Sequence, residues 1–206
     1  APFIVCDETD GYDRTSEGHP VGLLWQRAAT FGDQRLLLEI STPTIKGESH
    51  IETAFEQGDQ RYFHVVCPHC GHVQKLTWGQ VDWDKDEDGE HLPETATYLC
   101  AADGCGTAWN DAERRAAIRN AEKQGGGWIA KRPFRGHASY HLSELYSCFR
   151  RLKDIVQSFL DKKAAGDLQT FVNVSLAETW EEAGDKLEAA DLMARAEKFS
   201  APAPRG

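Results

Sequence analysis

Two short apolar runs frame the first part of the chain and predict neighbouring strands of one sheet. Residues 3–6 form an unbroken apolar run, which acidic and turn residues follow at once. Residues 35–40 contain a second run, and Pro43 stops it because proline cannot continue a central strand. Between the runs, residues 21–31 place apolar side chains at helical spacing up to Gly32. The order strand, helix, strand over so short a distance predicts a parallel sheet.

Helix signals recur in the rest of the chain. Ser49 and Glu52 have the spacing of a capping box, which predicts a short helix to about Gln57. Residues 110–180 have a mainly helical pattern. The helices expected there are one capped by Asn110 with Glu113 and ending at the glycine run 125–127, one with an apolar face at Leu152, Ile155, Val156, Phe159 and Leu160, and one from Asp167 to about Trp180.

The region between these two parts carries closely spaced cysteines. Cys67 and Cys70 form a tight C-x₂-C knuckle, and Cys100 and Cys105 form a looser second one. Two close pairs at this separation fit tetrahedral Zn²⁺ better than the disulfide framework of a secreted protein, so the chain is expected to be cytosolic. Four thiolates leave no open coordination position, which predicts a structural metal.

Apolar stretches lead into and away from these knuckles, which is the outline of a small zinc ribbon at residues 61–109. Three histidines stand near the first knuckle and are alternative ligands in place of a thiol: His64, His69 and His72. Alternatively, these are surface histidines and not metal ligands.

Composition narrows the class of protein further. The chain has 206 residues, 40% of them hydrophobic and 27% charged, and a net charge of −10, which is typical of a globular protein of one or two domains. It has no apolar run long enough to span a membrane, and no basic, apolar start typical of a signal peptide. The acidic balance argues against a general nucleic-acid coat.

Three basic clusters could still contact phosphates, although a solvated helix face or an interdomain salt bridge explains each of them as well. They are Arg114-Arg115 with Arg119, Lys131-Arg132-Pro133-Phe134-Arg135, and Arg150-Arg151 with Lys153.

The first apolar run ends in Asp7-Glu8, which is the pattern of a Walker B strand. The strand would present both carboxylates at the carboxyl edge of the parallel sheet, where ligands bind. Asp7 would then hold Mg²⁺, and Glu8 would polarise the water that attacks the γ-phosphate of ATP. Ser41 and Thr42 end the neighbouring strand and could sense that phosphate. Ordinary solvated turns are the alternative interpretation of both motifs.

An ordered series of short motifs between residue 3 and about residue 199 resembles the large terminase subunit of tailed phages, in its lambda-like branch. The motifs are Asp7-Glu8-Thr9-Asp10-Gly11-Tyr12, Glu17-Gly18-His19-Pro20, Arg27-Ala28-Ala29-Thr30-Phe31-Gly32, Ser41-Thr42-Pro43-Thr44, Cys67-Pro68-His69-Cys70-Gly71, Phe171-Val172-Asn173 and Glu178-Thr179-Trp180. This family packages DNA into capsids with an ATPase motor and cuts concatemers with a nuclease domain.

The resemblance implies a role for each matching position. Asp7 looks like the Mg²⁺-binding acid, Glu8 like the catalytic base, and Ser41 with Thr42 like the motif that couples hydrolysis to movement. No G-x-x-x-x-G-K-[ST] loop occurs in the 206 residues, so the phosphate cradle is missing, and ATP should bind poorly to this chain and not be hydrolysed. The family's nuclease carboxylates would lie beyond Gly206.

The resemblance therefore predicts an α/β chain from the middle of such a protein. The expected parts are the second half of an ATPase core with a partial P-loop-type parallel sheet at residues 1–60, the zinc ribbon at 61–109, a helical region at 110–180, and a linker toward a nuclease domain at 181–206. The start at Ala1-Pro2 without a methionine agrees with a piece of a longer protein, and a processed chain is the alternative.

The same resemblance implies cofactors and partners. The cofactors are ATP, Mg²⁺ and Zn²⁺. The partners are double-stranded phage DNA, the small terminase subunit, the portal of the procapsid and further copies in a homo-oligomeric ring, all in the bacterial host cytoplasm and without a membrane. Two alternatives remain: a non-enzymatic zinc-ribbon module that binds DNA or protein, and an inactive prophage remnant.

Overall fold

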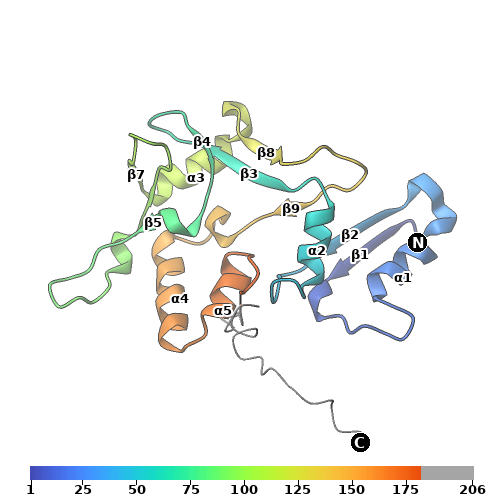
Figure 1. Cartoon of the computed structure of the whole chain (residues 1–206). Helices are drawn as coiled ribbons and strands as arrows, with labels where there is room; N and C mark the ends of the chain where they lie inside the picture. Colours follow the sequence, from blue (N-terminus) through green and yellow to red (C-terminus); the bar gives the residue numbers. More distant parts are fainter. Residues whose placement is uncertain (182–206) are drawn as a thin grey trace, which may run out of the picture.

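The structure is a computed structural model that describes residues 1–181, and Figure 1 shows the arrangement of its helices and strands. The chain is mixed α/β. Its first sheet pairs β1 (Phe3–Asp7) with β2 (Leu36–Ile40) in parallel, with Phe3 opposite Leu36 and Asp7 opposite Ile40. The predicted parallel pairing is thereby confirmed.

Helices α1 (Pro20–Arg27) and α2 (His50–Gln57) accompany this pair of strands. α1 begins where His19 Nδ1 accepts the backbone N–H of Val21, and proline occupies the first helical position. It ends sooner than the sequence predicts, because residues 29–34 turn into a 3₁₀ segment with Gly32 in a non-helical conformation. α2 has the predicted bounds.

One face of the β1–β2 pair lacks cover among the described residues. Five apolar side chains on it are 49–68% exposed: Phe3, Val5, Leu36, Leu38 and Ile40. The other face is covered, with Cys6 1% exposed. Parallel sheets are normally buried on both faces, so an exposed apolar face is unusual for a parallel pair of strands.

The second sheet is built around β3 (Arg61–Val66). β4 (Val73–Lys75) and β8 (Gly127–Ala130) pair with β3 in antiparallel fashion, and β9 (Tyr140–His141) pairs with it in parallel. β4 and β9 share one edge of β3, while β8 takes the other. The sequence did not predict β8 and β9, because it indicated mainly helices in this part of the chain and their partner strand is far away in the sequence.

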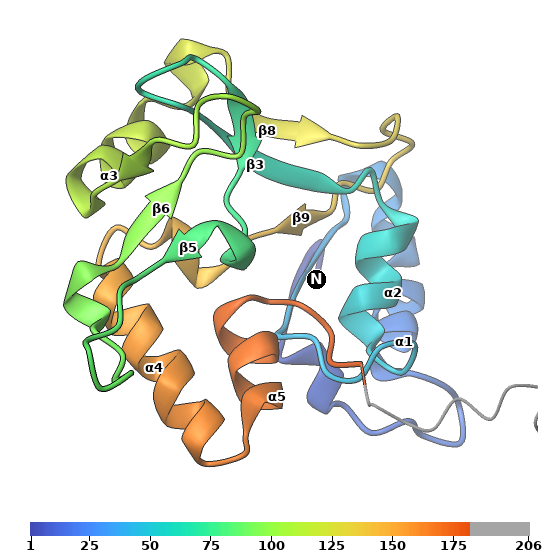
Figure 2. The same ribbon diagram turned by 60° about the vertical axis from the view of Figure 1, so that its left-hand side comes forward.

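A third, antiparallel sheet joins β5 (Val81–Asp82), β6 (Thr97–Leu99) and β7 (Ala108–Trp109). Figure 2 shows α3 (Asp111–Asn120) and α4 (Leu152–Ala164) flanking it on the side of the molecule away from α1 and α2. The main core lies here, and its most buried members are Val65, Tyr98, Trp109, Leu145, Leu152, Ile155, Val156 and Phe171.

The helices after residue 110 follow the sequence prediction only in part. Asn110 and Glu113 form the predicted capping box, and α4 presents the predicted apolar face. The last helix is shorter than predicted, because α5 (Leu168–Thr170) passes into a π-helix (Phe171–Ser175) and residues 176–181 are not helical. Most of the predicted linker 181–206 lies outside the described residues. No helix in the described part of the chain is long and apolar enough to cross a membrane.

Arg114 is a buried cation that fastens α3 to the segment before α4. Its guanidinium donates to the carbonyls of Leu145, Ser147 and Arg150, and it forms an ion pair with Asp111 at 2.8 Å. The Asp111 carboxylate in turn accepts the backbone N–H of Leu152. Because its donors are used internally, Arg114 is not a phosphate contact.

Replacing Arg114 should therefore destabilise the fold. We expect Arg114→Met to lower the free energy of unfolding by about 3 kcal/mol, because it leaves buried carbonyls and Asp111 without their donor. Arg119→Met, at an exposed position of the same helix, should cost less than about 1 kcal/mol. Urea unfolding of both variants measures this, and equal losses would contradict the assigned role.

Candidate functional site

The register of β1 and β2 brings the ends of both strands to one edge of the sheet. Asp7 lies opposite Ile40, so Glu8 and Ser41 follow at the same edge. Asp7 and Glu8 are exposed. Glu8 has φ 54° and ψ 48°, the left-handed region that non-glycine residues rarely adopt. Such strained residues cluster at functional sites. With Thr42, which follows Ser41, all four predicted residues lie at this edge of the sheet.

Asp10 organises this edge, and the sequence did not single it out as a site residue. Its backbone N–H donates to Ser41 Oγ at 3.1 Å, and Ser41 Oγ donates to the Thr42 carbonyl. The Asp10 carboxylate accepts the Thr44 hydroxyl at 2.8 Å and the backbone N–H of Ile51, in the first turn of α2, at 2.7 Å. One residue thus joins the turn after β1, the turn after β2 and the start of α2.

Histidines lie next to these turns. His50 Nε2 is 2.8 Å from a carboxylate oxygen of Glu39, and the His19 ring stacks on His50 with centroids 3.8 Å apart. Burial and the neighbouring His50 lower the pKa of His19. A neutral His19 ring suits its position, because its Nδ1 accepts a backbone N–H at the start of α1. This stack joins the start of α1 to the start of α2.

The π-helix and the segment after it are hydrogen-bonded to the loop that follows β2. The Asn173 amide donates to the carbonyls of Thr44, at 2.8 Å, and Glu178, at 2.9 Å. The Trp180 N–H donates to the Thr44 carbonyl, and the Trp180 carbonyl accepts the N–H of Lys46. Residues 44–52, which comprise this loop and the start of α2, therefore contact both Asp10 at the sheet edge and residues 173–181.

Glu52 closes the same arrangement. Its carboxylate accepts the N–H of Gly47 and the hydroxyl of Thr179, at 2.8 and 2.9 Å. Only half of the predicted capping box is formed, because Ser49 accepts the N–H of Glu52 while the Glu52 side chain serves these other donors. The motifs Phe171-Val172-Asn173 and Glu178-Thr179-Trp180 thus contact Thr44, the last residue of the Ser41-Thr42-Pro43-Thr44 motif, and Glu52.

The cysteine knuckles converge at a second, separate place. The Sγ atoms of Cys67, Cys70, Cys100 and Cys105 all lie within 4.8 Å of one another. The Cys70 and Cys100 sulfurs are 3.7 Å apart, close to the ~3.8 Å edge that Zn–S bonds of about 2.3 Å give in a tetrahedron. The set therefore has the size of a four-thiolate metal site.

Hydrogen bonds and burial act on these thiols in opposite directions. Burial raises the pKa of Cys100, and at Cys70 a hydrogen bond with the His72 backbone is outweighed by burial and the neighbouring thiols, which raise the pKa to about 12. Gln74 Nε2 donates to Cys100 Sγ at 3.4 Å, and the backbone N–H of His69 donates to Cys67 Sγ at 3.4 Å. Hydrogen bonds from the side chain and backbone of Thr107 lower the pKa of Cys105 to about 6. The nearby histidines have other partners, with His69 at 3.2 Å from Glu113 and His64 bonded to a backbone carbonyl.

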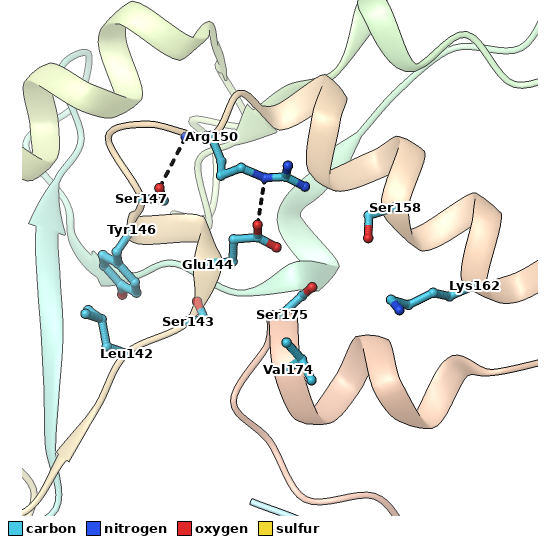
Figure 3. A pocket seen from close by; sticks show the side chains of 10 residues that line it. All are labelled: Leu142, Ser143, Glu144, Tyr146, Ser147, Arg150, Ser158, Lys162, Val174 and Ser175. Carbon is cyan, nitrogen blue, oxygen red and sulfur yellow. Dashed lines mark hydrogen bonds and ion pairs between the residues drawn. The ribbon is translucent and has the colours of Figure 1, made fainter. Parts of the chain in front are cut away.

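The described residues also form two hollows. The larger, of about 770 Å³, adjoins the sheet edge, and its lining includes Ser41, Pro43, Lys75 and Lys131. Figure 3 shows the smaller, of about 610 Å³, where the Arg150 guanidinium points to Glu144 at 2.8 Å. Arg150 and Arg151 of the third basic cluster are thus engaged within the fold, the latter with Asp154.

The family comparisons agree with the geometry of the sheet edge. A profile described as "Phage terminase large subunit gpA, ATPase domain" matches residues 1–128. A second profile, "Terminase large subunit gpA, endonuclease domain", matches residues 137–206. The chain belongs to the gpA family of phage terminase large subunits. The endonuclease match begins well before the linker predicted at 181–206, and the domain boundaries stay a prediction.

Two curated relatives are both named as large subunits of terminases. The terminase chain is 31% identical to "Terminase, large subunit" of Enterobacteria phage P21 over 98% of the chain and 34% of the relative. It is 30% identical to "Terminase, large subunit" of Escherichia phage lambda over 80% of the chain and 28% of the relative. The terminase chain thus spans about a third or less of these relatives, and no solved structure matches it.

The Asp10 contacts in this terminase chain predict a local effect of substitution. Asp10→Asn keeps the size of the side chain but leaves one acceptor oxygen for two donors, Thr44 and Ile51. We expect a loss of about 1–3 kcal/mol and faster amide hydrogen exchange in residues 41–52. Asp13→Asn, an exposed acid in the same stretch, is the matched control. Unchanged exchange in residues 41–52 of Asp10→Asn would contradict this role.

Proposed function

We propose that this chain is part of an ATP-driven motor that moves double-stranded phage DNA into a capsid. The observation that carries the proposal is the meeting of Asp7-Glu8 with Ser41-Thr42 at one sheet edge, within residues that the ATPase-domain profile matches. In this role the chain acts in the bacterial host with the small terminase subunit, the portal and further copies in a ring. Endonuclease activity belongs to the same protein.

Asp7 and Glu8 divide the chemistry between them. Asp7 would hold Mg²⁺, which neutralises phosphate charge when it is bound to ATP. Glu8 would accept a proton from the attacking water, and its left-handed backbone turns this side chain out of the strand direction. The exposed carboxylates of both residues are free of hydrogen bonds in the described part of the chain, which suits groups that await a ligand.

The fold of the nucleotide site is proposed to be a larger P-loop-type sheet. The exposed apolar face of β1 and β2 supports this, because further elements of such a core would cover it. The 206 residues contain no phosphate-binding G-x-x-x-x-G-K-[ST] loop. The cradle for the phosphates is therefore proposed to come from another part of a protein of the relatives' length.

Ser41 and Thr42 are proposed to couple hydrolysis to movement. Ser41 contacts Asp10 directly, so a displacement of Glu8 on phosphate loss would reach the turn after β2. The carbonyl of Thr44 then carries the change to Asn173 and Trp180. These contacts give the coupling motif a physical route to the region that the endonuclease profile matches.

The cysteine cluster is proposed to bind one structural Zn²⁺ in a zinc ribbon. Its four thiols and the donors around them fit that ion, and a closed thiolate set offers no position for substrate. The ion would join the β3–β4 knuckle to the β6–β7 knuckle. Metal binding of this kind contributes directly to the free energy of folding.

The zinc proposal has a direct test. Elemental analysis of the purified chain should find about one zinc per molecule, since tetrahedral four-thiolate sites hold a single ion. Cys70→Ser should lose the zinc and unfold the ribbon, while Cys148→Ser, an exposed cysteine outside the cluster, should keep both. A zinc content near zero in the unmodified chain, purified without chelators, would overturn the assignment.

The ATPase proposal is tested in the protein expressed from its whole gene. Glu8→Gln should still bind Mg²⁺ and nucleotide but hydrolyse ATP roughly 10²-fold more slowly, because only the base is lost. Asp7→Asn should also weaken Mg²⁺-nucleotide binding. Ser41→Ala should retain part of the hydrolysis while DNA packaging stops.

The controls separate the motor from the alternative of a non-enzymatic zinc-ribbon module. The 206-residue chain alone should show no ATP turnover, because the phosphate cradle is absent from its sequence. If Glu8→Gln hydrolysed ATP at the wild-type rate, Asp7-Glu8 would be an ordinary turn without a catalytic role. The non-enzymatic zinc-ribbon module would then be the better interpretation.

A further inference from the structure

The first and third basic clusters of the sequence are partly engaged in the fold. Arg114 is buried, Arg150 pairs with Glu144, and Arg151 pairs with Asp154 at 3.2 Å, whereas Arg119 and Lys153 form no ion pair with a described residue. Between β8 and β9 the whole cluster is without such a pair. Lys131 and Arg135 are exposed, and neither forms an ion pair with a described residue.

The loop between β8 and β9 is held in shape by Asp59. The Asp59 carbonyl accepts the N–H groups of Lys131 and Arg132, at 3.1 and 3.0 Å, and its own N–H donates to the His137 carbonyl. Its carboxylate accepts the N–H of Ser139 at 3.1 Å. Both ends of the loop are thus fixed at one residue, and Figure 1 shows the loop projecting beyond the sheet toward the side of α2.

Charge is strongly segregated at this loop. Residues 123–143 contain four Lys or Arg residues and no Asp or Glu, in a chain whose net charge is −10. Exposed aromatic rings accompany the cations, with Phe134 59% and Tyr140 52% exposed. The Arg61 guanidinium lies 5.2 Å from the Tyr140 ring centre and 5.9 Å from that of Phe134.

We propose that loop 131–135 binds the phosphate backbone of double-stranded DNA, a site that rests on the proposed function. An anchored loop offers cations in fixed positions, so little conformational entropy is lost when a rigid polyanion binds. The acidic remainder of the chain repels DNA, which favours contact at this loop. An acidic protein surface would be the other class of polyanion, and the proposed DNA-packaging function, on which this site rests, favours DNA.

The position of the loop fits a role in translocation. Lys131 and Arg132 line the larger hollow together with Ser41 and Pro43. Arg132 also donates to the carbonyl of Glu56 near the end of α2, at 2.8 Å. The DNA contact therefore shares a hollow with the turn that is proposed to sense ATP hydrolysis.

The test is the salt dependence of DNA binding by the 206-residue chain. Fluorescence anisotropy with a labelled duplex of random sequence gives the slope of log K against log salt concentration. Lys131→Gln with Arg135→Gln should reduce the magnitude of that slope by about 1.8, since each phosphate contact contributes about 0.9. The matched control is Lys85→Gln with Lys163→Gln, which changes the net charge equally at exposed positions elsewhere and should keep the wild-type slope.

Several outcomes would overturn the proposal. They are an unchanged slope in the loop variant, an equal loss in the control, no duplex binding by the unmodified chain, and tighter binding to a single strand or to a polyglutamate peptide than to the duplex. Thermal melting should show both variants folded, because all four side chains are exposed. Binding is measured without ATP, so failure here leaves the Glu8 test of hydrolysis unaffected.

Discussion

The carboxylate of Asp10 holds together segments that are far apart in the chain. Its two oxygens receive the Thr44 hydroxyl and the N–H of Ile51, while its backbone binds Ser41. A single acid can do this because α2 begins with unpaired backbone N–H groups that favour a negative partner. The candidate catalytic edge, the coupling turn and the first turn of α2 consequently form one hydrogen-bonded unit, and residues 173–181 are fastened to that unit through Thr44.

Local patterns in the sequence predicted those parts of the site that are built from residues close together in the chain. The apolar runs of β1 and β2 end in polar residues, and the parallel register then aligns Glu8 with Ser41. The close spacing of each cysteine pair similarly brought two thiols to one turn. Gly71, with φ 76°, follows Cys70 and allows the chain to reverse there.

Features that depend on distant partners were not predictable in this way. β8 and β9 are strands because each pairs with an edge of β3. No periodicity in residues 127–141 indicates that β3 is their partner. Asp10 looked like one more acid in a turn, since its hydrogen-bond partners lie 31–41 residues away. The last helix was overestimated for a related reason. The backbone of Trp180 forms its hydrogen bonds with Thr44 and Lys46 and not within a helix, and the Asn173 side chain, at the end of the helical part, also bonds Thr44.

β3 has a consequence for how genes of this family can exchange parts. It lies within the residues that the ATPase profile matches, yet β9 from the endonuclease match pairs with it, and the Tyr146 hydroxyl bonds Phe63 and Leu76 across the same boundary. A recombination joint placed between residues 128 and 137 would combine a sheet from one parent with an edge strand and core from another. Hybrid phages that survive such crosses should therefore inherit β3, β9 and Tyr146 as a single block, and joints that divide this block should be rare among viable recombinants.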